Sequence, residues 1–345
     1  MPPAFIRTYA CAFLIAVASP LPVLAQSNEA VGVRAQGMAG AFTAVADDAS
    51  ATWWNPAGLA GGAYLNTIIE FGTQREPRTD RDASGRPVPA WQVGTRSFAA
   101  AFPALGLSYY RLQVSEIQPQ TSTAATGGVR QDQGTADVRL RSLMLSQFGA
   151  TVGQSIGEHI VVGSTLKLVR GSLASDVRPG DGASLDQAVE LQGPVETHTG
   201  LDVGAMVSFG SARFGLVARN LSEPVFGSGA DALTLRRQVR AGLSYGTGRR
   251  GVIGSAVVAI EGDLTTTTTV LGDERRLAAG GEAWVLKRSL GFRGGVSLSA
   301  IGARRSSLSG GASVALRSGT YVDAQATGGS DDSRHGWSVA LRVTF

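Results

Sequence analysis

Residues 337–345 read WSVALRVTF and carry the clearest strand pattern in the chain. Apolar side chains take every second position from Trp337 to Phe345, and the positions between them are small or polar. This period of two is that of a β-strand. A strand that is apolar on one face and ends on an aromatic residue is typical of the lipid-facing wall of a membrane β-barrel, although a soluble sandwich also alternates.

The same alternation recurs through most of the sequence. Between Val252 and Leu264, the acids Glu261 and Asp263 share one face and Val258 and Ile260 share the other, so charged residues are expected to face inward. The pattern predicts about fourteen strands, most of them long enough to cross an outer membrane when tilted. They are expected at 64–74, 94–103, 104–115, 137–152, 159–171, 198–209, 211–220, 235–246, 251–264, 275–287, 290–301, 306–317, 319–327 and 335–345.

The connections between these strands differ in length on the two sides of the predicted sheet. Long polar connections are expected at 75–93, 116–136, 172–197 and 221–234. Tight turns alternate with them at 103–104, 154–158, 210–211, 247–250, 288–289 and 318–319. Short turns on one side and long loops on the other indicate a bacterial outer-membrane barrel with both termini in the periplasm.

The first residues predict a secretory signal. Arg7 precedes an apolar run over 10–17, and Val23-Leu24-Ala25 forms a small-residue exit before Gln26. We therefore expect a signal peptide at 1–25 and a mature chain that starts at Gln26. No later segment has the roughly eighteen uncharged residues of a transmembrane helix, so strands are expected to cross the membrane.

Composition excludes several other classes of function. The single cysteine, Cys11, lies in the predicted leader, which leaves no thiol for disulfides, zinc binding or nucleophilic catalysis. The formal net charge is +4, and the arginines are scattered among acids instead of forming one basic stripe, so nucleic acid is not expected as a partner.

Residues 37–60, GMAGAFTAVADDASATWWNPAGLA, fit neither a soluble domain nor a membrane strand. Small residues, the adjacent acids Asp47 and Asp48 and the adjacent tryptophans Trp53 and Trp54 are followed by a turn at 55–58. Such a composition favours a compact, irregular segment that packs inside a larger structure. We expect an N-terminal hatch at 26–63 and a barrel at 64–345.

The hatch region closely resembles the start of the FadL/OMPP1/TodX-type outer-membrane proteins, and most of all the PorV/PorQ-type branch. The resemblance rests on three stretches: RAQGMAGAF at 34–42, VADDAS at 45–50 and WNPAGL at 54–59. It implies an all-β, transmembrane antiparallel barrel of fourteen strands with the N-terminal segment folded into the lumen. It also implies a structural role in the hatch for a set of motif residues: Asp47, Asp48, Asn55, Pro56, Ala57 and Gly58.

Two functions follow from this resemblance. In the transporter branch, long-chain fatty acids or aromatic hydrocarbons diffuse passively through the plugged lumen and leave through an opening in the wall. In the PorV branch, the barrel is a scaffold or partner in protein secretion and does not transport small molecules. The shorter length of this chain argues against a full-sized surface binding groove.

Several residues are candidates for a path taken by a hydrophobic molecule. They are Phe42, Trp53 and Trp54 in the hatch and Leu143 and Leu145 on an otherwise polar strand face. On that same face Arg139 or Arg141 could pair with an anionic head group. The alternative is that the aromatic residues fill space and the arginines balance acids in the lumen.

The third predicted strand changes phase near its middle. Leu105, Leu107 and Tyr109 share one face, whereas Tyr110 and Leu112 begin an apolar series on the opposite face. We expect a β-bulge at Tyr109 and Tyr110, because a bulge bends a strand and could open the wall for lateral exit. The alternative is a bulge that only adjusts the shape of the barrel.

Motifs that suggest catalysis have simpler explanations here. The GQSIG stretch at 153–157 and the GTGRRG stretch at 246–251 both connect two strands, so neither opens a helix as a nucleophile elbow or dinucleotide site requires. No cluster of serine or histidine with catalytic partners was found, so a lipid-modifying enzyme ranks last. We predict a protein without enzymatic activity, metal or cofactor.

The predicted partners follow from this location. They are outer-membrane lipid, a hydrophobic or amphipathic small molecule, and the barrel-assembly machinery, which would recognise the last strand ending in Phe345. A secretion partner is expected if the PorV-like interpretation holds. Substrate identity is not predicted from the sequence.

Overall fold

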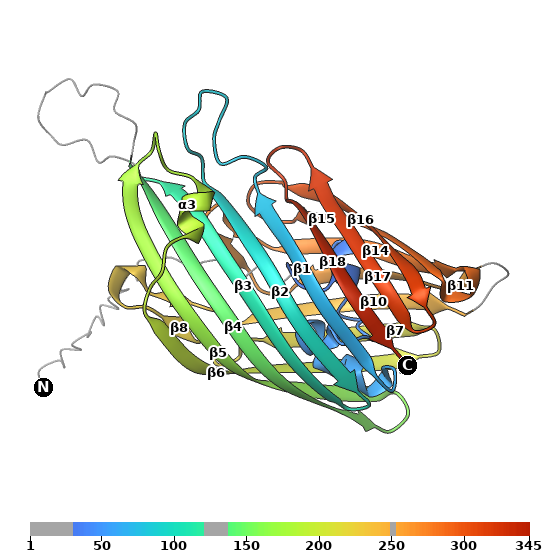
Figure 1. Cartoon of the computed structure of the whole chain (residues 1–345). Helices are drawn as coiled ribbons and strands as arrows, with labels where there is room; N and C mark the ends of the chain where they lie inside the picture. The colour runs from blue at the N-terminus through green and yellow to red at the C-terminus, as the bar shows by residue number, and fades with distance from the viewer. Residues whose placement is uncertain (1–29, 121–136, 249–252) are drawn as a thin grey trace, which may run out of the picture.

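The computed structural model describes residues 30–120, 137–248 and 253–345. Fourteen antiparallel strands form one closed barrel (Figure 1), in the order β1-β18-β17-β16-β15-β14-β11-β10-β7-β6-β5-β4-β3-β2. Their bounds are β1 Asn66–Glu76, β2 Ala90–Phe102, β3 Leu105–Pro119, β4 Asp137–Ile156, β5 Ile160–Pro179, β6 Val195–Phe209, β7 Ala212–Arg219, β10 Gln238–Thr247, β11 Ile253–Asp263, β14 Arg276–Val285, β15 Leu290–Ser299, β16 Ser306–Arg317, β17 Thr320–Gly329 and β18 His335–Thr344. The predicted all-β barrel is therefore confirmed.

Closure leaves no free sheet edge, because β1 pairs with both β2 and the last strand, β18. Along β18, Trp337, Val339 and Leu341 are exposed on the outer wall, while Ser338 and Arg342 are buried in the lumen. The alternation in WSVALRVTF thus separates the two faces of the wall. Each helix in the described parts of the chain is too short to traverse a bilayer.

The two ends of the barrel differ as expected. At the tight-turn end, β2 and β3 are joined by two residues, and so are β6 and β7. At the long-loop end, two hairpins interrupt the connections: β8 Val225–Phe226 with β9 Leu233–Thr234, and β12 Thr267–Thr269 with β13 Gly272–Glu274. β4 and β5 have 20 residues each: β4 extends past its predicted end at the tight turn, and β5 extends farther toward the long loops than predicted.

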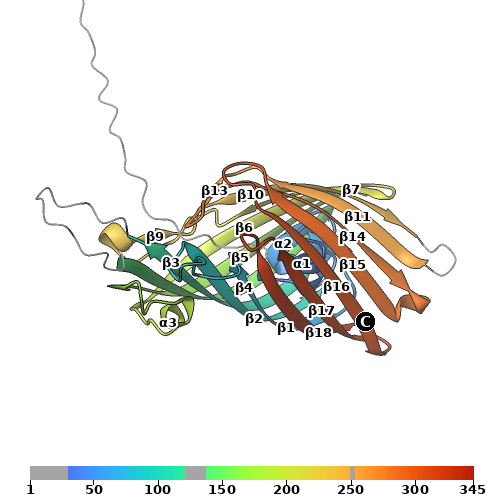
Figure 2. The same ribbon diagram turned by 90° about the horizontal axis from the view of Figure 1, so that it is seen from above.

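Residues 30–63, called the hatch below, lie inside the barrel (Figure 2). They contain the short helices α1 Val33–Gly37 and α2 Ala51–Trp54 and the 3-10 helix η2 Pro56–Gly61. Another helix, α3 Leu185–Val189, packs on the outer wall near the long-loop end, where Leu185 and Ala188 join Ile117 and Leu140 in an apolar cluster. The predicted signal peptide lies outside the described residues.

The predicted bulge at Tyr109 and Tyr110 is wrong. β3 pairs without a register shift with β2 from Leu105 to Ile117 and with β4 from Leu105 to Pro119. The apparent change of phase arises because the lumen side of β3 is also apolar here: Tyr110 and Leu112 are buried against the barrel interior, while Tyr109 faces outward. In the sequence, a strand with apolar residues on both faces shows the same change of phase as a strand with a bulge.

Candidate functional site

The hatch is tied to the barrel wall through a buried arginine. Arg34 of α1 makes two contacts with Glu282 of β14, Nε to Oε2 at 3.0 Å and Nη2 to Oε1 at 2.7 Å. Its Nη1 also lies 2.7 Å from both Asp47 and Asp48. Burial lowers the pKa of Arg34, but the charges of Glu282, Asp47 and Asp48 outweigh burial and hold its pKa well above the ordinary value. The arginine therefore joins two parts of the hatch to the wall.

Wall carboxylates also accept hydrogen bonds from the hatch backbone. Glu261 of β11 accepts from the amides of Phe42 (2.7 Å) and Thr43 (2.6 Å) and from the Thr43 hydroxyl (2.8 Å). Glu70 of β1 accepts from the Gly32 amide at 2.8 Å. Irregular backbone inside a barrel needs such partners, because it lacks a helix or sheet to satisfy its amides.

The predicted turn at 55–58 fits against the wall at very close range. The Asn55 side chain accepts from the Ala57 amide at 3.1 Å and donates to the Thr43 carbonyl at 2.9 Å, which caps η2 beginning at Pro56. A Cβ added at Gly204 of β6 would lie 2.0 Å from the Asn55 oxygen. A Cβ at Gly58 would lie 1.9 Å from the Ala46 carbonyl oxygen. Both positions require glycine because there is no room for a side chain.

The three hatch aromatics proposed for the path are packed and buried. Phe42 and Trp54 meet edge to face at 6.1 Å, and the Trp54 indole donates to the Val31 carbonyl at 2.9 Å. The Trp53 ring lies 4.9 Å from Tyr110 and 3.8 Å from the Arg219 guanidinium. These contacts stabilise the hatch and its seat on the wall, and contact with a substrate stays a prediction.

Above the hatch, toward the long-loop end, the lumen is apolar along β2–β5. Leu143 and Leu145 of β4 belong to one buried cluster with lumen-facing residues of the neighbouring strands: Trp91, Val93, Leu112, Val114, Val169 and Leu173. Phe226, Leu233 and Leu235, from the β7–β10 connection that contains β8 and β9, join this cluster. The structure thus brings Leu143 and Leu145 together within one buried apolar cluster.

Arg139 and Arg141 lie farther along the same strand face and contact that connection. Arg139 Nη1 is 3.2 Å from the Asp231 carboxylate, and Arg141 Nη2 donates to the Asp231 carbonyl at 3.2 Å. Arg141 is also the cross-strand partner of Glu116. Both arginines therefore hold a loop of the protein at the position where an anionic head group was expected.

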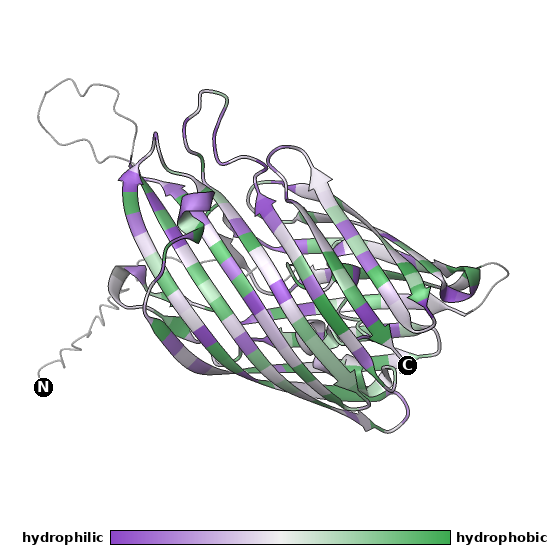
Figure 3. Ribbon diagram, viewed as in Figure 1, coloured by the Kyte–Doolittle hydropathy of each residue, from purple (hydrophilic) through white to green (hydrophobic). Residues whose placement is uncertain are grey.

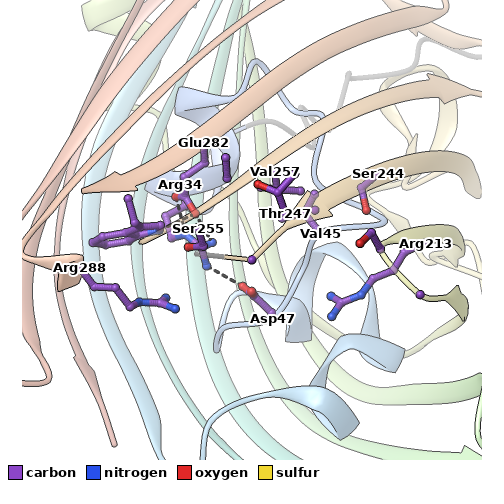
Figure 4. Close-up of a pocket in the computed structure, with 16 residues that line it drawn as sticks. Arg34, Val45, Asp47, Arg213, Ser244, Thr247, Ser255, Val257, Glu282 and Arg288 are labelled. Atoms are coloured by element: carbon purple, nitrogen blue, oxygen red, sulfur yellow. Dashed lines mark hydrogen bonds and ion pairs between the residues drawn. The ribbon is translucent and has the colours of Figure 1, made fainter. Parts of the chain in front are cut away.

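A polar cavity of about 350 Å³ lies below the hatch at the tight-turn end (Figure 4). Arg34 and Asp47 line it from the hatch, and Glu282, Arg213 and Arg288 line it from different parts of the barrel. Asp47 is 46% exposed, whereas Asp48 and Glu282 are each 3% exposed. The ion pairs that hold the hatch therefore border this cavity.

Sequence reasoning missed the principal anchors of the hatch: Arg34, Glu70 and Glu282. The available signal was the inward phase of acids, which correctly placed Glu261 in the lumen. It did not identify partners, because the pairs join residues far apart in the sequence, such as Arg34 and Glu282. Alternation predicts which side of the wall a residue faces. It does not predict at which level along the barrel axis the hatch contacts that wall.

A family model described as "F plasmid transfer operon, TraF, protein" matches residues 83–253, slightly less than half of the chain. No curated protein matches the sequence at a significant level.

Solved structures of hydrocarbon channels superpose on nearly the whole chain. The "CymD monoaromatic hydrocarbon channel" has a TM-score of 0.59 at 15% identity, with 93% of this chain and 99% of that chain covered. The Ralstonia pickettii toluene transporter TbuX gives 0.59 at 13% identity, with 92% and 99% covered. A Pseudomonas aeruginosa FadL homologue gives 0.52 at 12% identity, with 91% and 98% covered.

These neighbours name no PorV- or PorQ-type protein, so that narrower assignment stays a prediction. Identities of 12 to 15% establish a common architecture and leave the transported molecule open. The closed barrel, the folded-in N-terminal segment and the superpositions together assign the fold: this chain has the fold of the FadL- and TodX-type outer-membrane channels.

Proposed function

We propose that this protein is a passive outer-membrane channel for hydrophobic or amphipathic small molecules. The observation that carries the proposal is the buried apolar cluster on the lumen side of β2–β5, next to the hatch. The names of the neighbouring structures, which include toluene and monoaromatic hydrocarbon channels, support the same class of solute.

The chemistry of the lumen favours a solute with a large apolar part. Burying an alkyl chain stabilises the bound state by about 0.8 kcal/mol per methylene, so few polar contacts are needed for affinity. Leu143, Leu145 and Leu112 offer such a surface, and they lie beside the hatch aromatic Trp53 through Tyr110. Long-chain fatty acids and aromatic hydrocarbons both meet this requirement.

For a solute to pass through the barrel, the hatch must move on the side that faces the polar cavity. The Arg34 cluster is the natural point of control, because its ion pairs with Asp47 and Glu282 border both the hatch and that cavity. Buried ion pairs have discrete arrangements, so a local shift would open or close the route as a unit. The hatch thus acts as a gate whose closed form is described here.

We place the tight-turn end in the periplasm and the long-loop end at the cell surface. Outer-membrane barrels have short periplasmic turns and longer extracellular loops, and the lengths found here follow that division. In this orientation the apolar surface lies toward the outside of the cell and the polar cavity toward the periplasm. Transport would then proceed from the apolar surface past the hatch.

Uptake into liposomes tests the proposal. Vesicles containing the purified barrel should accumulate labelled oleate or toluene faster than empty vesicles. Changing Leu143 and Leu145 to asparagine should lower the rate about tenfold, because a loss of about 1.4 kcal/mol of contact energy is one factor of ten.

A double variant with Leu185 and Leu191 changed to asparagine is the matched control. Leu185 of α3 and Leu191 just after it pack in the apolar cluster on the outside of the wall, so their loss should leave uptake unchanged. Equal uptake by wild-type and empty vesicles, for both solutes, would refute the proposed function.

A further inference from the structure

Three arginines point outward from the barrel in one row across neighbouring strands. Arg96 of β2 is the direct cross-strand partner of Arg111 of β3. The row continues through Ser146 of β4 to Arg170 of β5. All three arginine side chains are exposed, and alternation places them on the outer face.

The outward positions of β1–β4 around this row carry no negative charge, and two acids on the same wall, Asp186 and Glu190, are in or next to α3. Every outward position of β1–β4 holds an uncharged residue or an arginine. On β5 the nearest outward acid, Asp176, pairs with Arg178 at 2.7 Å. The Arg111 guanidinium contacts the Met144 sulfur at 3.0 Å, and within the described residues none of the three arginines has a carboxylate partner. Like charges directly opposite each other are unfavourable, so the row favours binding of an external anion.

An apolar groove of about 520 Å³ lies immediately on the tight-turn side of this row. Its nearest edge is the next outward row, Phe98, Tyr109, Phe148 and Leu168, about 7 Å away as expected for two residues along a strand. Tyr109 and Phe148 pack ring against ring at 4.7 Å. The lower ends of β2 and β3, which border the groove, are mostly hydrophobic (Figure 3).

On the other side of the row, the outer wall becomes polar and is then covered by protein. The Gln113 side chain donates to the Val189 carbonyl of α3 at 2.7 Å, and α3 shields Ile117 and Leu140. The arginines therefore lie at the boundary between a surface exposed to lipid and a surface covered by the chain itself. Phosphate groups of membrane lipids lie where the hydrocarbon interior of the bilayer ends.

A second groove on the opposite wall shows that the arginines are a local feature. It measures about 490 Å³ and is lined on the outside by Leu243, Ile260 and Val296. Beyond its long-loop edge Ala218 and Val239 are direct cross-strand partners, and the outward position after Leu277 is a single arginine, Arg275. Apolar grooves of this size are thus found on both walls, and a row of three arginines distinguishes one of them.

We propose that the outer wall of β2–β5 is a binding site for a phosphorylated, multiply acylated lipid. The phosphate groups bind Arg96, Arg111 and Arg170, and the acyl chains fill the groove beside Tyr109 and Phe148. The spacing of the row fits more than one phosphate, because its ends are three strand spacings apart, about 14 Å. This site is separate from the lumen, so its loss would leave the proposed transport unaffected.

Native mass spectrometry of the detergent-solubilised full chain tests the site, with diphosphoryl lipid A as the probe. Wild type should retain the lipid, and the triple variant R96Q/R111Q/R170Q should retain about tenfold less, because charge-assisted contacts to phosphate are lost. Monophosphoryl lipid A should be retained less than the diphosphoryl form. Millimolar inorganic phosphate should not displace the lipid, because phosphate cannot occupy the groove.

The matched control is R236Q/R237Q/R304Q, which removes three exposed arginines elsewhere. Equal retention by the two triple variants would overturn the proposal, and so would displacement by inorganic phosphate. Ala150→Trp provides a second approach if the first triple variant does not fold, because it fills the groove and keeps all three arginines. That variant should also lose the lipid, and full retention would again contradict the site.

Discussion

The two sides of the lumen hold the hatch in different ways. On β10–β18 and β1, carboxylates and amides bind it directly: Glu261, Glu282 and Glu70 contact the hatch backbone or Arg34. On β2–β5 the hatch contacts hydroxyl groups, such as Tyr110 to Thr52 at 2.6 Å. The lumen face of these strands also carries charges, Lys167, Arg139 and Arg141, but they pair with other parts of the barrel and its loops, and the stretch around Leu112, Leu143 and Leu145 is apolar. The ion pairs on the first side therefore fix the position of the hatch, and in the proposed channel the apolar stretch on the second side would contact the solute.

This division follows from the physics of burial. Buried charges must be paired, which gives directional contacts with few alternative arrangements. Apolar contacts are non-directional, so another apolar molecule can replace them with little loss. A gate between two such sides can stay attached to one and separate from the other. Variants that act on one side only can test this idea.

The largest effect is expected from Glu282→Ala. Removal of this carboxylate takes one buried partner from both Arg34 and Arg293, which keep only Asp48 and Asp323 as buried carboxylates, and removes the acceptor of the Trp284 indole at 2.9 Å. Breaking a buried pair in this way costs about 3–5 kcal/mol. The unfolding midpoint in urea should fall, and trypsin should cleave within the hatch.

Glu274→Ala is the control for that experiment. Glu274 pairs with Arg276 and Arg305 near the long-loop end, at 3.2 Å each. Its loss should lower stability while the hatch stays resistant to trypsin. Equal cleavage of the hatch in both variants would mean that Glu282 has no special role in holding it.

A smaller effect is expected where the wall touches the Asn55 turn. In Gly204→Ala the new Cβ would displace the Asn55 side chain, which bonds to Ala57 and Thr43. Unsatisfied groups at such a site cost about 1–3 kcal/mol. Urea unfolding should show this loss, and Gly94→Ala should not, because its Cβ meets nothing within 4 Å.

A double-mutant cycle sharpens the result for this turn. If the clash with Asn55 is the cause, Gly204→Ala combined with Asn55→Ala should cost less than the sum of the two single changes. Strict additivity would show that Gly204 acts through another contact. In that case the close fit of the turn would not be what holds this part of the hatch.

The strand pattern predicted the barrel well because each strand is specified locally. Alternation in β18 and the acids of β11 depend on neighbouring residues in the sequence, and the structure confirms both faces. The prediction was wrong at Tyr109 and Tyr110. Both faces of β3 are apolar there, so alternation of apolar and polar residues no longer distinguishes the inner face from the outer face. A change of phase in hydrophobicity is ambiguous when lumen and lipid both accept apolar residues.

The site was harder to predict than the fold. The hatch motif identified Asp48 and Asn55, but their contacts are with Arg34 in one case and with Thr43 and the β6 wall in the other. These partners depend on how deep the hatch lies in the barrel, which no local pattern encodes. Leu143 and Leu145 were found because they interrupt a polar face, a signal that is visible in the sequence itself.

The smallest effect is expected from Asp47→Asn, although Asp47 and Asp48 contact the same Arg34 nitrogen at the same distance of 2.7 Å. Asp47 is 46% exposed to the polar cavity, so water screens its charge and replaces its contact. An ion pair of this kind contributes about 0–1 kcal/mol. Asp48 is 3% exposed and also accepts from the Ser50 amide at 2.9 Å.

Asp48→Asn should therefore lower stability clearly more than Asp47→Asn, as measured by urea unfolding of the two variants side by side. High salt should weaken the contribution of Asp47 and leave that of Asp48 nearly unchanged, because exposed pairs are screened and buried pairs are not. If the two variants were equally destabilised, the cavity would not reach the Arg34 cluster in solution. The gate would then have to open somewhere other than the charged side. The difference between the two sides of the lumen would not explain how the hatch opens.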